Sequence, residues 1–195
     1  MSRRFFRRDE HREIGEGLSR RRFLKLSTGI AAGLLIAPVH AGQGRLRRRA
    51  LSLNNLHTGE KLTRTYWEDG EYLSEPLSDI DYLLRDYRTD DIHPIDPQLL
   101  DVLHQLQHEV GSRKAFEIIS GYRSPKTNAM LRGNSGGVAK KSLHMQGKAI
   151  DIRLPGQDLG RLRQAALSLK AGGVGYYPKS NFLHIDTGRV RHWGK

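Results

Sequence analysis

Two short stretches in which apolar and polar residues alternate constrain the fold of this chain most strongly. In residues 149–154 and again in residues 182–186, an isoleucine or leucine occupies every second position. Because successive side chains of a strand point to opposite faces of a sheet, these apolar residues would face a core. Asp151, His184 and Asp186 would then lie on the other face. The pattern predicts two strands that carry ligand-type side chains away from the core.

The rest of the sequence predicts further strands and helices around this pair. Asp96 before Pro97 is typical of a helix start, and Gly111 of the helix end. Other segments with strand or helix patterns are a hairpin at 52–67, a short helix at 80–87, a strand at 115–120, a helix at 158–169 and a strand at 172–177. This order predicts a compact single-domain α+β fold with a central antiparallel sheet.

Residues 1–41 have the layout of a bacterial export signal. Ser19–Lys25 matches the twin-arginine pattern S-R-R-x-F-L-K, and the apolar run that follows is too short and too rich in glycine for a comfortable membrane span. We expect cleavage after Ala41, which would leave a domain at 42–195 with a flexible basic start at 42–50. The alternative is an uncleaved anchor helix.

The chain carries 33 lysines and arginines against 21 acidic residues, a net charge of +12. Such an excess indicates an anionic partner, which could be nucleic acid, a membrane surface or a cell-wall polymer. Export to the periplasm argues against nucleic acid, and we expect a monomer without stable membrane insertion after signal removal. A cationic wall-tethering or nucleic-acid-binding module is an alternative that rests on charge alone.

The chain contains no cysteine, so a metal ion would have to be bound by histidine and carboxylate side chains. His144 lies just before the first strand and could join Asp151 and His184. Two imidazoles and one carboxylate leave a fourth position open, as in catalytic zinc sites. The alternative is a strand-end carboxylate, a hydrogen-bonded strand histidine and a loop histidine. Spacing alone leaves both interpretations open.

A family resemblance favours the metal site. The motif S-x-H-x-x-G-x-A-x-D at 142–151, followed by a strand histidine, resembles the signature of the D-alanyl-D-alanine metallopeptidase group, which includes relatives of lysostaphin and of the hedgehog signalling domain. The segment SGYRSP, at 120–125, resembles an upstream segment of the same family. The resemblance implies a hedgehog-like or DD-peptidase-like fold and one zinc ion. Its ligands would be His144, Asp151 and His184.

The resemblance also implies an activity. It indicates an exported zinc metallopeptidase that hydrolyses amide bonds in peptidoglycan peptide cross-links through a zinc-activated water, with 3→3 meso-diaminopimelate cross-links as the expected substrate. Arg123 would face the substrate or the developing oxyanion, and we expect Ser142 and Tyr176 to contact the stem peptides. The alternative is a non-catalytic zinc-containing module that binds cell-wall peptides.

The general base is the point at which this chain departs from several members of the family. Those members carry a carboxylate three residues before the last zinc histidine, where this chain has Asn181. An amide cannot accept a proton at neutral pH. We expect His192 to act as the base and Asp186 to orient His184, with Asp186 as the alternative base.

Overall fold

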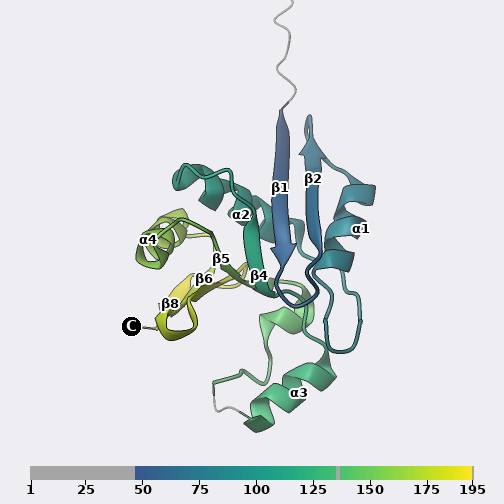
Figure 1. Cartoon of the computed structure of the whole chain (residues 1–195), viewed down its shortest axis with the longest axis vertical. Coiled ribbons are helices and arrows are strands. Elements are labelled where there is room, and N and C mark those ends of the chain that lie inside the picture. Colours follow the sequence, from purple (N-terminus) through teal and green to yellow (C-terminus); the bar gives the residue numbers. More distant parts are fainter. Residues whose placement is uncertain (1–46, 135–136, 195) are drawn as a thin grey trace, which may run out of the picture. The chain divides into compact units, whose positions relative to one another are not determined.

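One mixed sheet organises the computed structural model, which describes residues 47–134 and 137–194 (Figure 1). Within that part of the chain the strand order is β3-β2-β1-β4-β5-β7-β6-β8. The strands are β1 Arg48–Asn55, β2 Lys61–Glu68, β3 Glu71–Tyr72, β4 Phe116–Ser120, β5 Ala149–Arg153, β6 Gly173–Tyr177, β7 Phe182–Asp186 and β8 Arg191–Trp193. The predicted export signal at 1–41 lies outside the described residues.

The sheet is mixed, so the prediction of an antiparallel sheet is wrong for two strand pairs. β1 runs parallel to β4, and β6 runs parallel to β8. After β7 the chain reverses and places β8 on the free edge of β6. Because β6 is itself antiparallel to β7, a strand that reverses after β7 must run parallel to β6. The prediction of one compact domain that combines helices with a single sheet is confirmed for the described residues.

The helices are α1 Ser74–Leu83, α2 Pro97–Glu109, α3 Pro125–Asn134 and α4 Leu159–Leu169, with short 3₁₀ turns η2 Leu143–Gln146 and η3 Pro178–Ser180. The predicted start of α2 is confirmed, because the Asp96 carboxylate accepts a hydrogen bond from the Gln98 backbone N–H at 3.0 Å. None of the described helices is long and apolar enough to cross a membrane.

Two helices differ from the prediction. α1 lies earlier than the predicted 80–87, because the chain turns at Asp86, whose carbonyl accepts the backbone N–H groups of Thr89 and Asp90. α3 was not predicted, although Ser124 and Pro125 form a recognisable start. The Ser124 hydroxyl accepts the backbone N–H of Thr127 at 3.2 Å.

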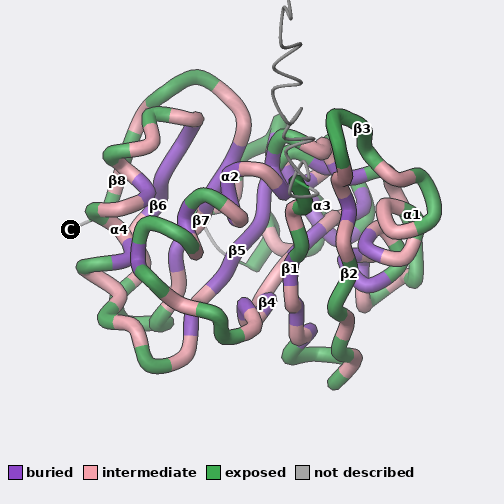
Figure 2. The backbone as a smooth tube through the Cα atoms, turned by 90° about the horizontal axis from the view of Figure 1, so that it is seen from above, coloured by how far each residue is buried: buried purple, intermediate pink, exposed green. Residues whose placement is uncertain are grey.

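The main core lies between the sheet and helices α2 and α4, which pack against each other and share one apolar cluster with β5 and β7. Ile150, Ile152, Leu183 and Ile185 are all at most 2% exposed in it, as the alternating pattern predicts. β5 runs through the middle of the molecule and is buried over most of its length (Figure 2). The opposite face of β5 and β7 is therefore free to carry polar side chains.

Candidate metal centre and its cavity

The register between β5 and β7 brings the predicted ligands together. Asp151 is paired directly with His184 across the two antiparallel strands. Side chains that face each other on one side of a sheet lie about 4.5–5.5 Å apart at their Cβ atoms, so the two groups can touch. The distance between Asp151 Oδ1 and His184 Nδ1 is 2.9 Å.

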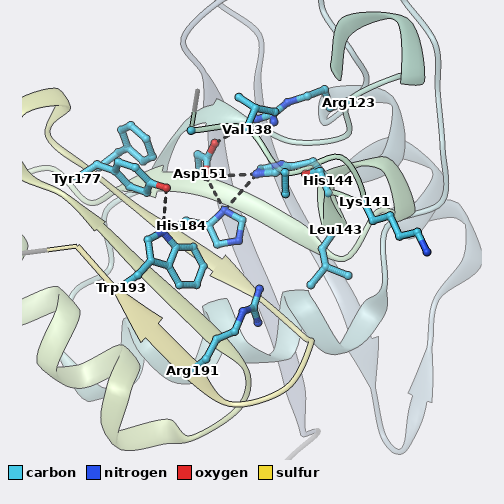
Figure 3. A pocket seen from close by; sticks show the side chains of 14 residues that line it. Arg123, Val138, Lys141, Leu143, His144, Asp151, Tyr177, His184, Arg191 and Trp193 are labelled. Carbon is cyan, nitrogen blue, oxygen red and sulfur yellow. Dashed lines mark hydrogen bonds and ion pairs between the residues drawn. The ribbon is translucent and has the colours of Figure 1, made fainter. Parts of the chain in front are cut away.

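His144 reaches the same point from the turn η2. Gly147 ends this turn with a φ of 65°, and a Cβ atom there would lie 2.1 Å from the carbonyl oxygen of Pro94. The glycine therefore permits both the left-handed turn and its close packing. His144 Nε2 lies 3.2 Å from His184 Nδ1 and 3.4 Å from Asp151 Oδ1. Figure 3 shows the three side chains pointing toward one another.

The geometry of the three groups fits a tetrahedral metal ion. Ligands about 2.0–2.1 Å from zinc in a tetrahedron lie about 3.3 Å from one another, and the observed separations are 2.9, 3.2 and 3.4 Å. The ligand atoms of His144, Asp151 and His184 are suitably grouped for one ion. Two imidazoles and a carboxylate are a donor set that zinc accepts in catalytic sites.

Each histidine also forms a hydrogen bond through the ring nitrogen that faces away from the other ligands, as metal-binding histidines usually do. His144 Nδ1 donates to the backbone carbonyl of Gly121 at 2.8 Å, and His184 Nε2 donates to Asp186 Oδ2 at 3.0 Å. These bonds fix which nitrogen of each ring faces the other ligands. The remaining nitrogens, His144 Nε2 and His184 Nδ1, both face Asp151.

The electrostatics of the cluster favour positive charge between the three groups. Burial lowers the pKa of His184, but its bonds to Asp151 and Asp186 outweigh burial and raise this pKa to about 9. Burial alone would raise the pKa of Asp151, yet His144 and His184 hold it well below its usual range. A positive charge between the three groups, whether a proton or a metal ion, is therefore favoured.

Asp186 is fully buried and has all its acceptor positions occupied. Its carboxylate accepts the backbone N–H groups of Gly173 at 3.0 Å and Gly188 at 2.9 Å, in addition to His184. Arg191 donates to both of its oxygens, at 2.9 and 2.7 Å. Burial acts to raise the pKa of Asp186, but these donors hold it below its usual range. The structure thus gives Asp186 the orienting position and does not support the alternative of a general base.

Two glycines of β6 make room for the side chains of the edge strand β8. A Cβ atom at Gly173 would lie 2.4 Å from both Asp186 Oδ2 and the Arg191 guanidinium, and one at Gly175 would lie 2.7 Å from the Trp193 ring. Arg191 and Trp193 therefore lie across β6 and reach the residues of β7. The Trp193 ring centre is 5.2 Å from that of His184.

A Gly175→Ala protein is expected to be less stable, by about 1–3 kcal/mol, because overpacking forces a side chain out of its preferred position. The added methyl would push the Trp193 indole away from His184. Thermal or urea unfolding measures the change. Gly133→Ala is the matched control, since Gly133 lies in the exposed part of α3 and a Cβ atom there would meet nothing within 4 Å. Equal stability of the two variants would contradict the packing argument.

The three ligand residues lie in a cavity of about 460 Å³. Arg123 and Ser142 line it on one side, and an aromatic group of Tyr177, Phe182 and Trp193 lines it as well. Asp151 is the only carboxylate among the described residues of the lining. Arg191 and Lys141 also line the cavity, and Figure 3 shows the Lys141 side chain pointing away from the three ligand residues.

Backbone hydrogen bonds of Arg123 and of the next residue hold Arg123 close to the three ligand residues. Its backbone N–H donates to the His144 carbonyl at 3.2 Å, and the next residue, Ser124, donates its N–H to the buried carboxylate of Asp86 at 2.8 Å. The guanidinium lies 3.6 Å from Asp151 Oδ2. Burial lowers the pKa of Arg123, and its Nε is buried without a hydrogen-bond partner.

The model of one protein family matches residues 44–193, and that family is described as Peptidoglycan L,D-endopeptidase MepK. The chain belongs to this family. A Peptidoglycan L,D-endopeptidase MepK of Escherichia coli strain K12 is 48% identical over 176 residues, which are 90% of this chain and 97% of the relative. A Probable peptidoglycan L,D-endopeptidase MepK of Haemophilus influenzae is 45% identical over 178 residues, 90% of this chain and 95% of the relative.

Membership of the MepK family confirms the metallopeptidase resemblance drawn from the motifs and the prediction of an enzyme. The family matches nearly all of the described residues, including both the strand pair and the segment around Arg123. The interpretation as a cationic tethering module, which rested on charge alone, has no further support.

The residue expected as the base and the position at which several relatives carry a carboxylate both lie outside the cavity of this MepK family member. His192 is exposed, because it alternates on β8 with Arg191 and Trp193, which face the cavity. Asn181 is also exposed, in a left-handed turn with a φ of 53°. The expectation of His192 as the base therefore has no support from the structure.

The structure places Tyr177, and not Tyr176, in the cavity. Tyr176 was expected to contact substrate, but it shares a face of β6 with Val174 and packs against the core, under the guanidinium of Arg163 at 4.8 Å. Tyr177 lines the cavity instead. Gly173 and Gly175 share the strand face of Tyr177, and because a glycine marks neither a buried nor an exposed face, the sequence did not separate the two tyrosines.

Proposed function

We propose that this chain is an exported zinc-dependent endopeptidase that hydrolyses 3→3 meso-diaminopimelate cross-links of peptidoglycan. The observation that carries the proposal is the cluster of His144, Asp151 and His184 in an open cavity of a MepK family member. A zinc ion held there would supply Lewis acidity, which polarises a scissile carbonyl and makes a water molecule more acidic. We infer that one ion is bound per chain.

Three other residues of the chain are proposed to carry the remaining roles in the reaction. Arg123 is proposed to stabilise the negative charge that develops on the scissile carbonyl oxygen, because its half-buried guanidinium lies beside Asp151 and has an unpaired Nε. Asp186 is proposed to orient His184. Ser142, which is buried at the edge of the cavity, is proposed to contact the peptide.

The bond named in the family description supports the choice of cross-link. A 3→3 cross-link joins the carboxyl group at the L centre of one meso-diaminopimelate to the amine at the D centre of another, which makes an L,D bond. A 4→3 cross-link joins two D centres. The relatives are named as L,D-endopeptidases. We infer the same preference here.

The proposal includes delivery to the cell wall. The twin-arginine motif at 19–25 and the small-residue site ending at Ala41 support export to the periplasm and a domain at 42–195. We propose that the enzyme acts there as a monomer on peptidoglycan stem peptides, without nucleic acid and without a membrane-inserted segment after signal removal.

Digestion of purified sacculi tests the function and the metal together. Zinc-loaded protein is expected to remove 3→3 linked dimers from the muropeptide profile and to leave 4→3 linked dimers. A chelator should stop the reaction, and added zinc should restore it. Loss of 4→3 dimers alone, no loss of any dimer, or cleavage that survives the chelator would contradict the proposal.

An Asp186→Asn protein is expected to lose about 10- to 100-fold in zinc affinity or activity, the usual effect of changing a group that orients a ligand. The amide cannot accept from His184 and from every present donor at once, so the ring of His184 loses its fixed orientation. Competition with a chromophoric chelator measures the affinity. Asp79→Asn, on the surface of α1, is the control. Unchanged zinc affinity and activity would show that Asp186 has no orienting role.

A further inference from the structure

Tyr177 places a phenol hydroxyl in the cavity beside the proposed zinc ligands. Figure 3 shows its hydroxyl pointing toward Asp151 and His184. β6 ends at this residue, and η3 follows directly, so the side chain lies at the rim where the strand leaves the sheet. None of the roles proposed above for Arg123, Asp186 and Ser142 uses this group.

The hydroxyl is held in place by one specific bond. Trp193 Nε1 donates to Tyr177 Oη at 2.9 Å. An indole N–H can only donate, so the phenol oxygen is the acceptor and keeps its own proton for a further partner. Among the described residues that proton meets no hydrogen-bond acceptor, and the cavity is the space next to it.

The aromatic ring of Tyr177 is also held in place. Tyr177 is paired with Phe182 across β6 and β7, and their rings stack with centres 4.5 Å apart and an angle of 14°. Trp193 in turn lies over Gly175, where a side chain would displace it. A donor fixed in this way loses little conformational freedom when it binds a ligand.

We propose that the Tyr177 hydroxyl donates a hydrogen bond to an oxygen atom of the cross-linked peptide bound in the cavity, which makes it a substrate-contacting residue of the proposed reaction. The inference rests on the proposed function for the identity of the ligand. Peptide carbonyls and the carboxylates of diaminopimelate are the acceptors that such a substrate offers. The other donors that line the cavity are mainly cations, namely Arg123, Lys141 and Arg191.

The test compares Tyr177→Phe with Tyr176→Phe. Both variants lose only one hydroxyl, but Tyr176 packs against the core on the other face of β6. Steady-state cleavage of a soluble 3→3 cross-linked muropeptide dimer gives kcat and KM. Tyr177→Phe is expected to lower kcat/KM by roughly 3- to 10-fold if the bond forms to bound substrate, and by about 100-fold or more, in kcat, if it forms to the reacting oxygen. Tyr176→Phe should match the wild type.

A second readout separates this inference from the proposed function. Metal-free protein should bind the same dimer without cleaving it, and calorimetry gives the affinity of each variant. If zinc-loaded wild type cleaves no cross-link, the proposed function fails, and a weaker affinity of Tyr177→Phe still supports the contact. The inference is overturned if Tyr177→Phe equals Tyr176→Phe in both kcat/KM and affinity. Unchanged thermal midpoints and zinc content show that both variants are folded and loaded.

Discussion

A His184→Ala protein is expected to retain no zinc and to cleave no cross-link. His184 is the central member of the cluster, because it contacts both Asp151, at 2.9 Å, and Asp186, at 3.0 Å. Without it one imidazole and one carboxylate remain, fewer than the three protein ligands that catalytic zinc sites use. Zinc content after dialysis and digestion of sacculi measure the two losses.

His192→Ala is the matched control for this experiment. It removes the same ring eight positions later, from an exposed site on β8 that faces away from the cavity. We expect zinc content and activity close to the wild type. If His192→Ala retained zinc but lost activity, the result would support His192 as the general base. Circular dichroism of the His184 variant checks its fold, since the change removes one hydrogen-bond partner from each of two buried carboxylates, Asp151 and Asp186.

An Arg123→Met protein is expected to keep its zinc and to lose about 100- to 1000-fold in kcat, the range found when one donor to an oxyanion is removed. Methionine replaces the aliphatic part of the side chain but not the guanidinium that lies 3.6 Å from Asp151. The backbone bonds of this residue to His144 and of Ser124 to Asp86 remain. The His144 ligand should therefore stay in position.

Arg161→Met provides the comparison, because Arg161 is an exposed residue of α4 and the same substitution there should change neither kcat nor KM. A rise in KM alone in Arg123→Met would indicate ground-state binding of the peptide in place of oxyanion stabilisation. Loss of zinc from Arg123→Met would instead assign Arg123 to the support of Asp151.

The ligand-bearing strands could be predicted from the sequence because burial forces their side chains to alternate. Once Ile150 and Leu183 face the core, Asp151 and His184 must face away from it, whatever the rest of the fold does. The register of a strand against its neighbour could not be predicted in the same way, because strand pairing depends on distant parts of the chain. The register that sets Asp151 opposite His184 became visible only in the structure.

The residues of β6 and β8 that surround the ligands were harder to predict. β8 is short, with three residues, and a pattern of that length does not define which side chain faces a site. His192 was therefore preferred for its chemistry, while Arg191 and Trp193 face the cavity. In β6 the glycines hide the alternation that would have separated Tyr176 from Tyr177, since a glycine marks neither a buried nor an exposed face.

The sheet itself sets the spacing of the site. Pairing places Asp151 beside His184, His184 beside Gly175, and Gly175 beside Trp193, so one row of residues crosses β5, β7, β6 and β8. Adjacent strands lie about 4.8 Å apart whatever side chains they carry. A protein designer could therefore transfer this row to another sheet of the same strand directions, because the distances belong to the backbone and only the residue types would need to be copied.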